Sequence, residues 1–89
     1  MESTFPQIDI FHKAILKFGT SRQIEKCKQE LFELVIALNS GDKTSIVDEV
    51  ADVFIMVQQM AIIYGVEDVK KRIDLKADLL QSRIFLNQR

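Results

Sequence analysis

Two pairs of acidic residues have a spacing that could bring their carboxylates to a common point. Glu30 and Glu33 are three residues apart, and so are Glu49 and Asp52. Residues three apart on a helix lie about 5–6 Å from each other on one face. Four converging carboxylates repel one another unless a cation neutralises them, and hard divalent cations prefer oxygen ligands. The four residues therefore predict a Mg²⁺ site, with Mn²⁺ as the alternative ion.

Other metal and nucleophile chemistries lack the residues that they need. Cys27 is the sole cysteine and His12 the sole histidine, which excludes a disulfide within the chain and a cysteine-based zinc site and argues against a His-dependent triad. Neither acidic pair carries the Glu-x-x-His motif of ferritin-like di-iron proteins. The single thiol, together with an N-terminus that has no basic and apolar leader, predicts a cytoplasmic protein.

The elements that would position the carboxylates are helices, so the expected fold class is all-α. Three glycines and one proline punctuate the chain and divide it into four expected helices, over residues 7–18, 21–39, 43–64 and 67–86. Thr20 and Gln23 have the spacing of a capping box before the second helix. No segment alternates with a period of two, so no strand is expected.

The second and third expected helices form a central antiparallel hairpin, because only a short turn around Gly41 separates them. Counted from Asn39, near the centre of the stop-and-turn segment, Glu30 lies about nine residues before and Glu49 about ten after. At about 1.5 Å per residue, the two acidic pairs reach similar heights on facing helices. One Glu-x-x-Glu pair by itself usually marks a solvent-exposed helix face, but two pairs at matched heights favour a metal site.

The size and composition of the chain predict a single domain, over residues 1–89, that assembles with copies of itself. The chain has 89 residues, 47% of them hydrophobic, and a formal net charge of −1. A chain this short buries little surface by itself. The expected core stripes are Ile24, Cys27, Leu31, Leu34 and Leu38 on the second helix, and Val69, Ile73, Ala77, Leu80 and Ile84 on the fourth. The third helix is apolar on nearly all sides, which predicts a buried helix in a homo-oligomeric bundle, a dimer or a tetramer. The balanced charge points to neither nucleic acid nor a membrane as a partner.

The sequence around the acidic pairs resembles the MazG-like all-α nucleoside triphosphate pyrophosphohydrolases, in particular their short phage and bacterial type. The segments that carry the resemblance are Lys28-Gln29-Glu30-Leu31-Phe32-Glu33-Leu34 and Asp48-Glu49-Val50-Ala51-Asp52-Val53. They match a signature of Glu-Glu-x-x-Glu, a spacer, and Glu-x-x-Asp. The resemblance implies a Mg²⁺-dependent enzyme that cleaves a nucleoside or deoxynucleoside triphosphate to the monophosphate and pyrophosphate.

By position, the resemblance implies that Glu30, Glu33, Glu49 and Asp52 bind the metal. We expect either Glu33 or Glu49 to act on the attacking water as the catalytic carboxylate. On the fourth helix Lys76 and Arg83 are candidates for contacting the phosphates, although long basic side chains beside a buried stripe also commonly reach out to water. Phe18 is a candidate for stacking on the nucleobase, with core packing as its other role.

The sequence leaves two alternative functions open. Phosphoribosyl-ATP pyrophosphohydrolase is similar in size and fold, but its Tyr-His after the second acidic pair is missing here. The other alternative is a non-catalytic helical oligomerisation or regulatory module with a decayed site. Two departures from the pattern favour it: Gln29 stands where a Glu is common, and Leu79 stands where a basic residue is common.

Overall fold

The expected all-α class is confirmed in the computed structural model, which describes residues 7–87. Four helices follow one another: α1 over Ile8–Phe18, α2 over Thr20–Ser40, α3 over Lys43–Tyr64 and α4 over Val66–Asn87. Each agrees with its expected range to within one residue at either end, because the glycines that divide the sequence also end the helices. Met1 to Pro6 and the last two residues lie outside the described part.

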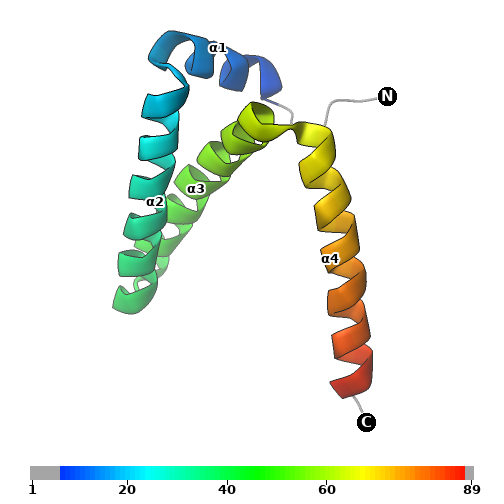
Figure 1. Ribbon diagram of the computed structural model, residues 1–89. Coiled ribbons are helices and arrows are strands. Elements are labelled where there is room, and N and C mark those ends of the chain that lie inside the picture. The colour runs from blue at the N-terminus through cyan, green and yellow to red at the C-terminus, as the bar shows by residue number, and fades with distance from the viewer. Residues whose placement is uncertain (1–6, 88–89) are drawn as a thin grey trace.

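The turn between α2 and α3 occupies only Gly41 and Asp42, and both residues are suited to it. Gly41 ends α2 with φ +74°, a left-handed conformation that glycine adopts without steric cost. Asp42 begins α3 as its N-cap, and its carboxylate accepts hydrogen bonds from the backbone N–H of Ser45 at 2.9 Å and from the Ser45 hydroxyl at 2.8 Å. The chain therefore reverses within two residues, and α2 and α3 form a V whose open end is bridged by α1 (Figure 1).

The predicted capping box at the start of α2 is wrong. Gly19 is the N-cap, with φ +91°, and no side chain caps this end of the helix. Thr20 is already the first helical residue. The Gln23 side chain, which a capping box would turn back towards Thr20, instead donates a hydrogen bond from Nε2 to Oε1 of Gln59 on α3, at 2.7 Å. This bond across the helix interface is buried, and it occupies the amide that the local motif would need.

The buried face of α2 is rotated away from the expected apolar stripe. Cys27 is buried as expected, but Leu31 and Leu38 are exposed. The other buried residues of α2 are Gln23, Glu30 and Ala37, so polar side chains occupy much of the interface with α3. The rotation places Glu30, rather than a leucine, against α3, and this brings the acidic pairs together.

Helix α4 extends away from the other three helices, and of these described helices it contacts only α3, near the end of that helix (Figure 1). None of its described residues is buried, so the expected inward stripe has no partner within the described chain. The expected burial of α3 is also incomplete, because Val47, Phe54, Ile55 and Val57 are 40–60% exposed. Much of the apolar surface of a single chain is therefore left uncovered.

Candidate metal centre

Three of the four predicted carboxylates meet between α2 and α3. Glu30, Glu49 and Asp52 each offer one carboxylate oxygen, and these oxygens lie within 4.8 Å of one another. Glu30 comes from the buried face of α2, and the other two come from adjacent positions on the facing side of α3. The convergence follows from the helix period and the short turn, as the spacing predicts.

Two oxygens of this cluster lack a partner. Glu30 Oε1 and Glu49 Oε1 are both buried, and neither has a hydrogen bond within the described residues. A buried carboxylate oxygen without a partner is costly, because it has lost its water and gained nothing in return. The other oxygen of Glu30, Oε2, lies 3.2 Å from the Lys26 ammonium. A cation between the carboxylates would satisfy the two orphaned oxygens, so the donor set fits a hard divalent ion.

The carboxylates also perturb one another. Burial raises the pKa of Glu49 above its ordinary value, and the neighbouring charges of Glu33 and Glu30 raise it further. Burial likewise raises the pKa of Asp52, with Glu30 and Asp48 adding to the effect. Both groups therefore resist ionisation in the metal-free protein. A bound cation would oppose this resistance by favouring the charged forms.

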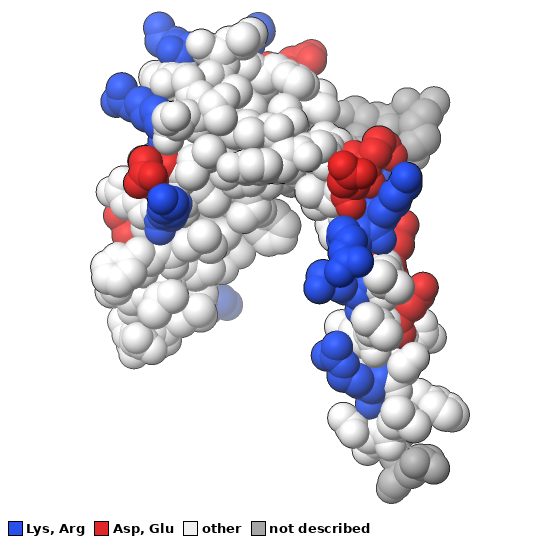
Figure 2. Space-filling view, viewed as in Figure 1, with Lys and Arg blue, Asp and Glu red and all other residues white. Residues whose placement is uncertain are grey.

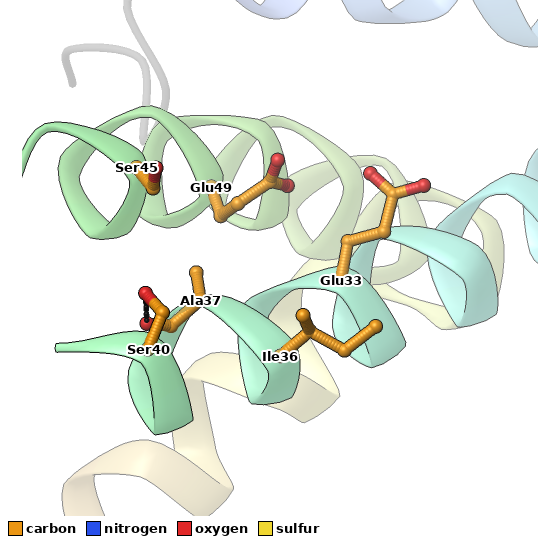
Figure 3. A pocket seen from close by; sticks show the side chains of 6 residues that line it. All are labelled: Glu33, Ile36, Ala37, Ser40, Ser45 and Glu49. Atoms are coloured by element: carbon orange, nitrogen blue, oxygen red, sulfur yellow. Dashed lines mark hydrogen bonds between the residues drawn. The ribbon is translucent and has the colours of Figure 1, made fainter. Parts of the chain in front are cut away.

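Glu33 lies outside the three-carboxylate cluster but beside it. Figure 3 shows Glu33 and Glu49 at one end of an open cleft of about 300 Å³ between α2 and α3. Its other lining residues are Ile36, Ala37, Ser40 and Ser45. Gln29, which stands where the family signature has a Glu, donates a hydrogen bond to Glu33 Oε2 at 3.3 Å. The amide thus holds the Glu33 carboxylate on the cleft side without adding a fifth acid.

The predicted substrate-binding residues are spread over two regions. Phe18 is about half exposed and lines a largely apolar cavity of about 670 Å³, together with residues of α1, α2 and α3 that include Phe11 and Phe54. Lys76 and Arg83 lie on α4, which extends away from the carboxylates within one chain. Figure 2 shows basic side chains gathered along one side of that helix.

Lys26 also belongs to the site, although the sequence motifs did not indicate it. Among the described residues, its ammonium is the one cation paired with the carboxylate cluster. The spacing in the sequence could have indicated this pair, because Lys26 and Glu30 are four residues apart and such residues are neighbours on a helix surface. The buried amide pair of Gln23 and Gln59 was missed as well. No local pattern links those two residues, which are 36 positions apart.

Comparison with known proteins identifies the family of this chain. The profile of the phosphoribosyl-ATP pyrophosphohydrolase family matches residues 4–77, which covers most of the chain and all of the carboxylate cluster. Comparisons with curated proteins and with solved structures give no significant match. In the described part of the chain, no helix has the length and apolar character needed to span a bilayer.

Proposed function

The chain belongs to the phosphoribosyl-ATP pyrophosphohydrolase family, a pyrophosphohydrolase family of the MazG-like all-α superfamily, and we propose that it is a metal-dependent enzyme that cleaves nucleoside triphosphates. The products would be the nucleoside monophosphate and pyrophosphate. The observation that carries the proposal is the cluster of Glu30, Glu49 and Asp52 with its two unpartnered, buried oxygens. Such a cluster has the donor atoms that Mg²⁺ or Mn²⁺ takes in enzymes that act on phosphates.

The roles of the acidic residues follow from their positions. Glu30, Glu49 and Asp52 would hold the cation, and Glu33 would complete the set from the cleft side. Bound there, Mg²⁺ or Mn²⁺ would orient the phosphates and offset the charge that develops on them. The chain itself must hold the attacking water, and Glu33 and Glu49 are the carboxylates that line the open cleft.

In the proposed reaction, the water oxygen forms a bond to the α-phosphorus while Glu33 or Glu49 accepts a proton from that water. The bond between the α-phosphorus and the α–β bridging oxygen breaks, and the bridging oxygen leaves with pyrophosphate. The nucleoside would lie in the apolar cavity beside Phe18. Residues of α3 that are neighbours of Asp52 in the sequence line part of this cavity.

Phosphoribosyl-ATP is the second candidate substrate, because the matching family is described by it. The segment after Asp52 favours the nucleoside triphosphate instead, because Val53, Phe54 and Ile55 stand where the Tyr-His of phosphoribosyl-ATP enzymes is expected. Both substrates present the same bond between α- and β-phosphates. The two substrates differ in the group that would occupy the cavity near Phe18.

The assembly that we propose is a homo-oligomer of single-domain chains, each with α2 and α3 as its antiparallel hairpin. Exposed apolar residues on every helix support it, including Phe32 and Ile36 on α2 and Ile73 and Leu80 on α4. In such a bundle the α4 helix of one copy could bring Lys76 and Arg83 to the phosphates bound by another. Among the described helices of one chain, α4 contacts only α3.

A panel of canonical nucleoside and deoxynucleoside triphosphates, with phosphoribosyl-ATP beside them, tests the proposed substrate. Pyrophosphate release is measured with Mg²⁺, with Mn²⁺ and with EDTA. We expect metal-dependent release from at least one nucleoside triphosphate at a higher kcat/KM than from phosphoribosyl-ATP. The reverse order would establish the second candidate. No release from any of them would favour the non-catalytic module.

A further inference from the structure

Two cations on α2, Arg22 and Lys26, lie on the turns that precede the carboxylate cluster. They are four residues apart, and Glu30 follows Lys26 by four more, so the three form a row along one face of the helix. The Lys26 ammonium lies 3.2 Å from Glu30 Oε2, while its side chain remains half exposed. The Arg22 guanidinium lies 5.8 Å from the centre of the Phe18 ring.

A small cavity opens beside this row. It measures about 230 Å³ and is lined by Phe18, Arg22, Gln23, Lys26 and Met56. Met56 is one helical turn beyond Asp52 on α3, just as Lys26 is one turn before Glu30 on α2, so the cavity is about 6 Å along the helices from the carboxylates. Its volume is that of about eight water molecules, which is large enough for a diphosphate group.

The pairing of Lys26 differs from that of the other described ion pairs. Lys28 pairs with Glu25, and Lys70 with Glu67, and all four of these carboxylate and ammonium groups are open to solvent. Glu30, in contrast, is buried, and its second oxygen has no partner in residues 7–87. A divalent cation that binds Glu30 would repel the adjacent ammonium and leave Lys26 free to turn towards the cavity.

We infer that Lys26 exchanges partners: it neutralises Glu30 in the metal-free protein and contacts the outer phosphates of the substrate once a divalent cation is bound. Arg22 supplies the second phosphate contact from the same cavity. The pair would hold the leaving pyrophosphate one helical turn from the carboxylates, within a single chain. This inference rests on the proposed function, and it assigns phosphate contacts to α2 in addition to those expected on α4.

Three methionine variants separate this exchange from a structural role, since methionine keeps the length of the side chain and favours helix. Mn²⁺ affinity of the metal-free protein is measured first. The affinity for the preformed Mn²⁺–pyrophosphate complex is then measured by calorimetry at constant free Mn²⁺. Lys28→Met is the matched control, because Lys28 lies two residues away on the opposite side of α2 and pairs with an exposed carboxylate, that of Glu25.

Lys26→Met should bind Mn²⁺ about twofold to fivefold more tightly, because the competing ammonium is gone. The same variant should bind the pyrophosphate complex about 10-fold to 100-fold more weakly, the scale of one lost charge-assisted hydrogen bond. Arg22→Met should weaken pyrophosphate binding and leave Mn²⁺ affinity unchanged. Lys26→Arg should restore pyrophosphate binding, and Lys28→Met should change neither affinity.

The inference is overturned if Lys26→Met melts like the wild type and binds pyrophosphate equally well. That outcome leaves the proposed function intact, because metal-dependent hydrolysis by the wild type is measured separately. A wild-type protein that binds neither Mn²⁺ nor its pyrophosphate complex would overturn both. An equal loss of pyrophosphate binding in Lys28→Met would also contradict a specific role for Lys26.

Discussion

Glu30 is the residue whose environment departs furthest from that of an ordinary surface glutamate. It is buried on a helix, one oxygen has no partner among the described residues, and two further carboxylates lie within reach. In a scaffold, such a group is a liability, because removing its charge would relieve both desolvation and repulsion. At a cation site the same arrangement becomes favourable once the ion is present, and this is why we attribute it to function.

The first prediction for a single residue concerns Glu33→Gln, which keeps the volume of the side chain and removes one charge. The variant should melt at the same temperature as the wild type or higher, because repulsion with Glu49 is relieved. Its turnover should fall about 10²-fold or more, as expected for loss of one acid–base or electrostatic contact. Thermal melting and pyrophosphate release are measured side by side. Full activity in the variant would remove Glu33 from the site.

The second prediction is the pH dependence of the metal-free protein. The pKa values of Glu49 and Asp52 are raised above 4.5 and 3.8 in the folded state, so the folded protein binds more protons than the unfolded chain just above these values. Stability from these groups is therefore lost as the pH rises through that window. In EDTA, the melting temperature should fall as the pH rises from the ordinary carboxylate range through the raised pKa values of Glu49 and Asp52, and saturating Mg²⁺ should reduce this fall.

The control for this pH dependence is the double variant Glu49→Gln/Asp52→Asn, in which both groups are uncharged at every pH. Its melting temperature in EDTA should vary less with pH than that of the wild type, and it should respond less to Mg²⁺. If the double variant and the wild type had the same pH profile and the same Mg²⁺ affinity, the two residues would not belong to a metal site.

At the scale of elements, the turn between α2 and α3 sets the register of the site. Replacing Asp42 with Ala removes the acceptor for both hydrogen bonds from Ser45. We expect the melting temperature to fall by about 4–8 °C, as for the loss of a helix N-cap in a small domain. The same hydrogen bonds lower the pKa of Asp42, so this contribution is present at neutral pH and lost as the pH falls through the acid range.

Thr44→Ala is the matched control for the cap, because Thr44 is exposed in the same turn of α3 and takes no part in the hydrogen bonds between Asp42 and Ser45. Its melting temperature should stay within about 2 °C of the wild type, as for most surface substitutions. An Asp42→Ala protein as stable as Thr44→Ala would contradict the role of the cap.

The elements and the acidic cluster were largely predictable from local patterns, whereas the helix faces were not. Glycines mark the ends of α1, α2 and α3, and spacing alone brings Glu49 and Asp52 to one face. Apolar periodicity failed on α2, because it treats Gln23 and Glu30 as surface residues although both are buried. The buried hydrogen bond of Gln23 depends on Gln59 of α3, a partner that no local pattern reveals.

At the scale of the whole molecule, one chain cannot cover its own apolar surface. Helix α4 has no buried residue in its described part, and Ile73, Leu80 and Ile84 are each at least 50% exposed along it. A soluble monomer rarely leaves so long an apolar face open. The bundle that we propose would cover it with a second copy, and apolar patterning within one chain could not reveal which faces meet.

The corresponding prediction is that the wild type is a dimer or tetramer at micromolar concentration, and that Leu80→Asp shifts it towards the monomer. A buried aspartate without a partner would destabilise the interface strongly. Ser82→Asp adds the same charge on the opposite side of α4 and should leave the assembly intact. Light scattering gives the mass of each protein. A monomeric wild type would contradict the proposed assembly.

In the proposed enzyme, the carboxylates between α2 and α3 hold the cation for pyrophosphate release. The most direct measurement is the rate of pyrophosphate release from the best nucleotide as a function of Mg²⁺ concentration, for the wild type and Glu49→Gln. We predict a saturable dependence on Mg²⁺ in the wild type, no release in EDTA, and a loss of about 10²-fold or more in the variant. Release that persists in EDTA, or that is equal in the two proteins, would contradict the account.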